Sequence, residues 1–215
     1  MRKNILKLFS VFAMTGFVTS TISAQSFEGV IEFTKKSTTD TTSYIYYVKG
    51  NSVRIDEIGA RSKKVEGSFL VNMDNKTLIM LNHDRKIYME QAIPSAPVVK
   101  GKPEVKKGSG TKTIQGYKCQ EFTVTNPEEN TKITYWLAND KFTFFEKLLH
   151  QMNRKDKSSV YYLQLPDIKN SFPMMSSQTD LADKPLVSLE VTKVSKKDTD
   201  VALYQIPKGY NKFEK

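Results

Sequence analysis

The sequence has little of what most catalytic and metal sites need. Among 215 residues there are one cysteine, Cys119, and two histidines, His83 and His150. A single cysteine cannot form a disulfide within the chain, and the histidines stand at no spacing that is typical of zinc ligands. Gly-rich phosphate loops, G-x-S-x-G motifs and paired catalytic carboxylates are also absent. The sequence therefore predicts a protein that is not an enzyme and that carries no metal or other cofactor.

Long apolar runs are also scarce, and the main one lies at the start of the chain. A basic beginning is followed by an apolar segment at residues 8–18 and by a small-residue end at 19–24. This order is typical of a secretory signal peptide, with cleavage predicted between Ala24 and Gln25. The apolar segment is shorter than the ~20 residues that a membrane span needs, so no transmembrane anchor is predicted. The mature chain is predicted to be periplasmic or secreted.

Acidic residues are outnumbered by basic ones. The chain has 33 Lys and Arg against 23 Asp and Glu, a formal charge of +10, of which +7 remains after the leader is removed. Nucleic acid is not a predicted partner. An exported protein reaches a compartment without nucleic acid, and no helix-turn-helix or RNP-like strand pair is present in the sequence. The lysines fit either contact with anionic lipid head groups or a solubilising surface.

The length of the mature chain fits a single domain, predicted at residues 25–215. One segment interrupts its pattern. Residues 93–112 contain three prolines, three glycines and five lysines against one glutamate. Such a composition favours a flexible loop, which we place inside the single domain rather than between two domains.

The first half of the domain alternates between apolar and polar residues, as strands do. Turn residues separate these segments, which predicts an antiparallel meander. The predicted strands are residues 26–34, 43–48, 52–58, 68–73, 77–81 and 86–90. The residues predicted to face inward or toward a ligand are Ile45, Tyr47, Val53 and Ile55.

The segment 113–153 combines the clearest hairpin with the one convincing amphipathic helix. Residues 117–125 and 131–138 read as paired strands around a turn that contains Pro127. The period then changes to that of a helix, which begins after a T-x-x-E capping box at Thr143. A helix of about three turns is marginal alone in water, so it should lie against the sheet.

The last third of the chain is less regular. Residues 158–165 are ambiguous between a second short helix and an extended segment. Residues 172–175, 185–194 and 201–206 read as late strands.

Four short motifs carry a resemblance to a known family. They are I-Q-G-Y-K-C at 114–119, Y-W-L-A-N-D at 135–140, F-P-M at 172–174 and Y-Q-I-P-K-G-Y at 204–210. In their order they resemble a family of secreted envelope proteins of Gram-negative bacteria that is classed as a domain of unknown function. Through that family the chain looks like the LolA/LolB-like superfamily of periplasmic lipoprotein carriers. The resemblance implies a cavity for acyl chains or another hydrophobic ligand, and it transfers no functional residue to this chain.

We therefore expect a mainly β (α+β) fold, a curved half-open antiparallel β-barrel of LolA/LolB-like form packed against one or two helices. The expected function is a non-enzymatic binding module that holds a lipid, an acyl chain or another hydrophobic ligand between sheet and helix. The alternative is a structural or protein-interaction domain of the envelope without a small-molecule ligand. The candidate partners are thus a lipid, the acyl chain of a lipoprotein, or an envelope protein. The residues expected to line the cavity are Phe145, Leu148, Leu149, Met152 and Trp136.

Cys119 and the histidines allow more than one interpretation. Cys119 could be a packed thiol, a group for redox or intermolecular pairing, or a nucleophile, and packing is the interpretation that the sequence favours. His83 lies in a predicted turn and His150 on the predicted helix, where each is expected to be solvated or structural.

Overall fold

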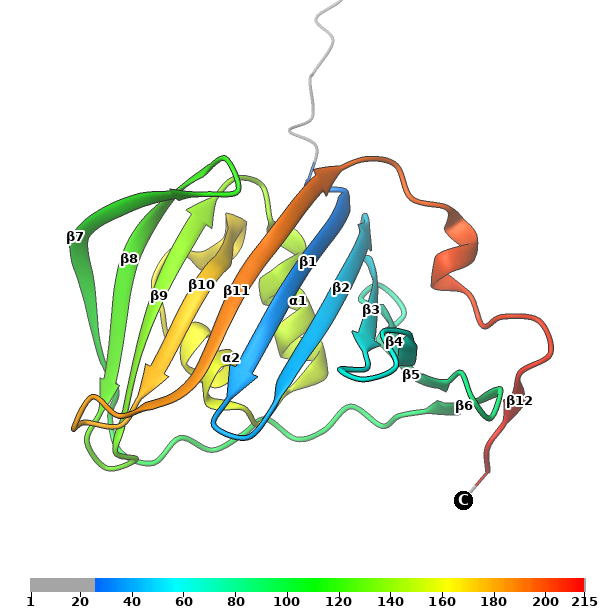
Figure 1. The fold of residues 1–215 in the computed structure, drawn as a ribbon, viewed down its shortest axis with the longest axis horizontal. Helices are drawn as coiled ribbons and strands as arrows, with labels where there is room; N and C mark the ends of the chain where they lie inside the picture. The colour runs from blue at the N-terminus through cyan, green and yellow to red at the C-terminus, as the bar shows by residue number, and fades with distance from the viewer. Residues whose placement is uncertain (1–25, 215) are drawn as a thin grey trace, which may run out of the picture.

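The computed structural model describes residues 26–214, which form one curved sheet of twelve strands with helices on one of its faces (Figure 1). The predicted signal peptide lies outside the described residues. The strand order is β12-β6-β5-β4-β3-β2-β1-β11-β10-β9-β8-β7. The predicted half-open, mainly antiparallel β fold is confirmed.

The first six strands form the meander that the sequence predicts. Each pairs antiparallel with the next, and short turns separate most of them. Their bounds are β1 Gly29–Ser37, β2 Thr41–Lys49, β3 Ser52–Ile58, β4 Val65–Asn72, β5 Thr77–Asn82 and β6 Ile87–Glu90.

The next five strands form a second meander, which joins the first where β1 pairs with β11. Their bounds are β7 Glu104–Ile114, β8 Tyr117–Asn126, β9 Thr131–Asn139, β10 Ser171–Thr179 and β11 Pro185–Lys196. The short β12, Asn211–Lys212, runs parallel to β6. The edge strands β7 and β12 lie at opposite ends of the sheet order, so the sheet is open.

The helices lie between β9 and β10 in the chain and cover one face of the sheet (Figure 1). Helix α1 spans Thr143–Met152, and its apolar stripe is buried as the sequence predicts. The predicted capping box is wrong: Phe142 is the N-cap, with no side-chain cap hydrogen bond, and Thr143 already lies inside the helix. At the other end Asn153 adopts the left-handed conformation, and its N–H donates to the carbonyl oxygen of Leu149 at 2.9 Å.

A second helix resolves the ambiguous segment after α1. Helix α2 spans Lys157–Tyr162, and the carboxylate of its N-cap, Asp156, accepts a hydrogen bond from the Ser159 N–H. Two short 3-10 helices follow, η1 at Ile168–Asn170 and η2 at Val201–Tyr204. The strand predicted at 201–206 is therefore wrong, because the Asp200 carboxylate accepts from the Ala202 N–H and caps a helical turn there.

The loop predicted at residues 93–112 also differs from the structure. Residues 91–103 have no regular structure, but Glu104–Ile114 form β7, which pairs with β8 across an irregularity at Lys107–Thr111. An edge strand is hydrogen-bonded on one side only, so it tolerates the lysines and glycines that suggested a loop.

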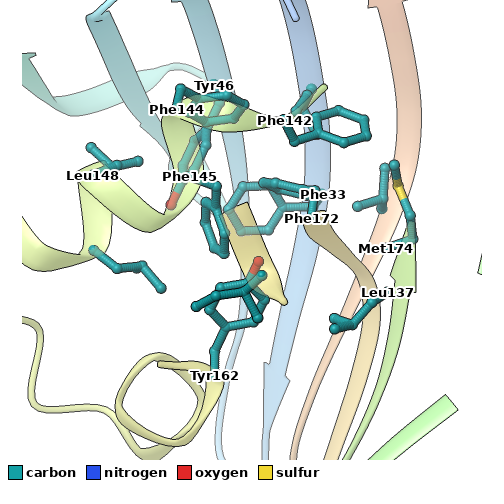
Figure 2. Close-up of a cluster of buried hydrophobic side chains, with 14 of the residues drawn as sticks. Phe33, Tyr46, Leu137, Phe142, Phe144, Phe145, Leu148, Tyr162, Phe172 and Met174 are labelled. Carbon is teal, nitrogen blue, oxygen red and sulfur yellow. The ribbon is translucent and has the colours of Figure 1, made fainter. Parts of the chain in front are cut away.

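An aromatic cluster fills the space between α1 and the sheet (Figure 2). The ring centroid of Phe145 lies 4.5 Å from that of Phe172 on β10 and 5.0 Å from that of Tyr162 on α2. Phe142 packs on Phe172 at 5.4 Å and on Phe27 at 4.9 Å. These rings join the sheet to both helices.

The opposite face of β3 and β4 carries a polar network that the C-terminal segment covers. Asp56 is buried, and its Oδ1 accepts from the Arg54 Nε and the Ser68 Oγ at 2.6 and 2.5 Å. His83 bridges this network to the C-terminus: its Nε2 lies 2.6 Å from the Ser68 Oγ and its Nδ1 2.6 Å from the Tyr210 hydroxyl. Of the two roles expected for His83, solvated or structural, these contacts show the structural one.

We expect the stability of the fold to depend on pH through His83. Burial, with a contribution from the charge of Arg54, lowers the pKa of His83 below its ordinary value of 6.5, and this outweighs the opposing effects of Asp56 and Asp84. The unfolded chain therefore binds this proton more readily than the folded chain does, and stability is lost as the pH falls from 6.5 through the lowered pKa. Urea unfolding between pH 8 and pH 5 should show this loss, and H83Q should reduce it. An unchanged pH dependence in H83Q would contradict the assignment.

Candidate functional site

Two neighbouring hollows lie on the helix-covered face of the sheet. An inner cavity of about 50 Å³ lies between β1, β2, β9, β10, β11 and the two helices. A wider groove of about 290 Å³ lies between β2 to β5, the end of α1 and residues 91–94. Both are lined by Tyr44 and Arg154, so these two residues stand between the hollows.

Apolar side chains line most of both hollows. In the inner cavity they are Phe33, Tyr46, Tyr135, Phe145, Leu149, Tyr162, Phe172, Pro173, Val187 and Leu189. In the groove they are Ile55, Phe69, Leu78, Ala92, Pro94 and Met152.

The structure separates the five predicted cavity residues. Phe145 and Leu149 line the inner cavity, and Met152 lines the groove. Leu148 is fully buried in the core and lines neither hollow. The stripe on α1 thus contributes to both hollows through three of its four predicted residues.

Trp136 lies on the other face of the sheet. Its neighbour Tyr135 faces the helices, where its hydroxyl donates to the carbonyl oxygen of Ser158 at 2.7 Å. Side chains alternate along a strand, so Trp136 points away from the helices. There the Lys112 Nζ lies 4.0 Å from the centroid of its ring. Trp136 therefore does not line either hollow, because only alternate residues of β9 face the helices and Trp136 is not one of them.

The sequence did not point to Arg154 or Asp156, which are the charged pair of the site. The Arg154 Nε donates to the Asp156 Oδ2 at 2.8 Å. Burial alone would raise the pKa of the Asp156 carboxyl, but the charge and hydrogen bond of Arg154, with help from Lys35 and the Ser159 N–H, lower it below its usual value. Asp156 is therefore an anion that both holds Arg154 and caps α2. An R-x-D pair directly after the predicted helix was the only signal.

The tyrosines around the site stay neutral at physiological pH. Burial raises the pKa of Tyr46 to about 12, although the charge of Arg154 opposes the shift. Burial also raises the pKa of Tyr44, which is shared by the two hollows. These hydroxyls are hydrogen-bonding groups rather than acids or bases.

Cys119 is a free thiol that is completely buried. Its Sγ lies 3.4 Å from the Tyr117 carbonyl oxygen, and burial raises its pKa. The packed-thiol interpretation is confirmed. Within residues 26–214 no group of three or more His, Cys, Asp or Glu side chains is placed to hold a metal ion.

The architecture defines the class of protein: a mainly β domain whose open, curved sheet wraps around helices that border two apolar hollows. Residues 27–210 match the family described as a domain of unknown function, DUF4412, and the chain belongs to this family. The predicted membership of a family of unknown function is confirmed. No curated protein matches the sequence.

Solved structures share this architecture at low sequence identity. An uncharacterized conserved protein from Thermus thermophilus is similar to the chain, with 9% identity, a TM-score of 0.52, and coverage of 86% of this chain and 90% of that one. This likeness shows a common fold.

Two further structures are more distant. The complex of MucA and MucB from Pseudomonas aeruginosa gives 11% identity, a TM-score of 0.49 and coverage of 84% and 55%. A putative outer membrane lipoprotein-sorting protein domain from Vibrio parahaemolyticus gives 11% identity, a TM-score of 0.33 and coverage of 81% and 87%. Both superpose too loosely to bear on the fold. No helix within residues 26–214 combines the length and apolar character that crossing a membrane requires.

Proposed function

We propose that this protein is a non-enzymatic binding module of the bacterial envelope, periplasmic or secreted, that holds the apolar part of a small amphiphile. The observation that carries this proposal is the groove of about 290 Å³, bordered by α1 and four strands and lined mainly by apolar side chains. The signal-peptide pattern of the sequence supports the location.

The size of the hollows limits the ligand. Sites for small molecules usually have roughly 300–1,000 Å³, and the groove, at about 290 Å³, lies just below that range. The inner cavity, at about 50 Å³, has no room for an acyl chain unless side chains move. We therefore propose a single short chain in the groove. Burying roughly 200 Å² of its apolar surface would contribute about 5 kcal/mol before the entropic costs of binding.

The segment between β6 and β7 forms one wall of the groove. It crosses below the sheet (Figure 1) and contributes Gln91, Ala92 and Pro94 to the lining. The Asn153 side chain at the end of α1 donates to the Pro94 carbonyl oxygen at 2.7 Å. Farther along, the Asn126 side chain donates to the Lys100 carbonyl oxygen at 2.7 Å. Hydrogen bonds thus hold the segment near both ends, and we propose that it controls entry to the groove.

Native mass spectrometry with lipid extraction tests this function on the mature chain purified from a Gram-negative envelope. We expect a stoichiometric single-chain amphiphile to remain bound. A mass without ligand, unchanged after single-chain lipids are offered, would contradict the proposal. It would favour the alternative of an interaction domain, whose partner crosslinking would then identify.

Filling the groove should strongly weaken binding without disturbing the core. Ala92 is exposed and lines the groove, so A92W places an indole where the ligand would lie. We expect the bound fraction to fall at least about tenfold, because the space that the chain occupies is lost. The matched control A182W changes an exposed alanine in the turn before β11, away from the groove, and should bind normally. Equal binding by the two variants would place the ligand elsewhere.

The alternative function has one observation in its favour. The outer edge of β7 carries no further strand in the described sheet, and an exposed edge can pair with an extended segment of a partner. Its lysines and its irregularity at Lys107–Thr111 are, however, features that usually protect an edge from such pairing. We therefore favour the groove.

A further inference from the structure

Arg154 occupies an unusual position for a cation. It is half-buried, it lines both the inner cavity and the groove, and most of the side chains around it are apolar or aromatic. A charge in such surroundings is costly unless its donors are matched by acceptors. The hydrogen bonds that Arg154 makes therefore show which of its N–H donors have no acceptor in the described part of the protein.

The Arg154 guanidinium is only partly satisfied by the protein. Its Nε donates to Asp156 at 2.8 Å, but among residues 26–214 its two terminal nitrogens form no hydrogen bond. Within the same residues, Thr179 Oγ1 is the one side-chain polar atom that is both enclosed and unpartnered. The terminal nitrogens of Arg154 are therefore not enclosed, and because Arg154 lines both hollows, up to four N–H groups remain for a ligand.

The other charges nearby do not supply the missing acceptor. The Asp156 carboxylate already accepts from Arg154, the Ser159 N–H and the Ser159 hydroxyl. Glu57 is exposed where it lines the groove and makes no ion pair with Arg154 in the described structure. Lys35 lines the inner cavity as a second cation. The inner cavity is thus bordered by two cations and one carboxylate, an arrangement that favours an anion.

We propose that Arg154 binds the anionic head group, a carboxylate or a phosphate, of an amphiphile whose short chain lies in the groove. This inference rests on the proposed function and adds the chemical class of the ligand. The planar guanidinium presents parallel N–H groups that match two oxygens of a carboxylate or phosphate, which a lysine cannot do in the same way. Asp156 is a positioning residue: it fixes Arg154 through Nε and leaves the terminal nitrogens free.

Three ligands with the same chain test the head group. Octanoate, octyl phosphate and 1-octanol are titrated into the mature chain at pH 7.5 by isothermal calorimetry. We expect at least one anionic ligand to bind about tenfold or more tightly than octanol, as for a hydrogen-bonded charge pair. The anion that binds more tightly identifies the head group.

Two variants assign this preference to Arg154. R154Q should lose the preference for the anion over octanol, and its retained binding of octanol also reports that the groove has folded. R154K keeps the charge without the planar fork and should retain only part of the preference. R85Q, in an exposed turn, is the matched control and should behave as the unmodified chain.

The outcomes separate the two proposals. Equal affinities for the three ligands, or an anion preference that survives R154Q, would overturn the role of Arg154 and leave the groove as a binding site. If the protein binds none of the three ligands, and also binds no single-chain lipid with a longer chain, the proposed function itself would be overturned.

Discussion

Replacing Phe172 with alanine is expected to lower the free energy of unfolding by about 3–5 kcal/mol, the range for truncating a buried phenylalanine. Phe172 is 2% exposed on β10, and its ring centroid lies 4.5, 5.4 and 6.0 Å from those of Phe145, Phe142 and Phe144 (Figure 2). The variant loses the transfer free energy of the ring and leaves a cavity between the sheet and α1. Urea unfolding followed by circular dichroism measures the change.

A matched phenylalanine on the surface provides the control. Phe213 is 47% exposed near the C-terminus, and F213A should change the free energy of unfolding by less than about 0.5 kcal/mol. A loss below about 1 kcal/mol in F172A would mean that the aromatic cluster does not hold the helix layer to the sheet.

Local patterns explain why so much of this fold could be predicted. The hairpins of β3 to β6 and of β8 and β9 alternate with a period of two and are separated by turn residues, which are signals between chain neighbours. The stripe on α1 has a period of 3.6, so it also identifies the face that packs on the sheet. These signals need no knowledge of distant parts of the chain.

The faces of β2 show where local patterns end. Its residues 44–48 are all apolar or aromatic, so the alternation carries no information about which face is inward. Ile45 and Tyr47 were predicted to face inward, but Tyr44 and Tyr46 line the hollows. The predictions for Val53 and Ile55 are confirmed, since both are buried in the core beneath the helices.

The site itself depends on contacts between distant segments. Pairing of β1 with β11 brings Phe33 and Leu189 to the same cavity. The local sequence of either strand does not indicate that it pairs with the other. Arg154 is part of the candidate site only because the fold places it beside Tyr44 and the groove. An arginine after a helix is otherwise an ordinary surface residue. The sequence could therefore predict a helix that packs on a sheet, but not that Arg154 lies between two hollows.

The second large effect is expected at Asp56, far from these hollows. Asp56 is 3% exposed, and its carboxylate accepts from Arg54 and Ser68. D56A removes the acceptor and leaves the guanidinium without its counter-charge beneath the C-terminal segment. Breaking one partner of a buried ion pair costs about 3–5 kcal/mol. We expect the same loss here, measured by urea unfolding at pH 7.5.

A double variant separates two contributions to the free energy of unfolding: the loss caused by an unpaired buried charge and the net stabilisation by the ion pair. Arg54 also donates to the Leu203 carbonyl oxygen at 3.3 Å, so it connects the network to η2. R54M/D56A removes both charges, and we expect it to be more stable than D56A because no buried charge is left unmatched. D183A, which removes an exposed ion pair with Lys132, should cost less than about 1 kcal/mol. If D56A were no worse than D183A, the network would be a solvated surface feature, and the C-terminal segment would have to be held by its other contacts with β3 and β6.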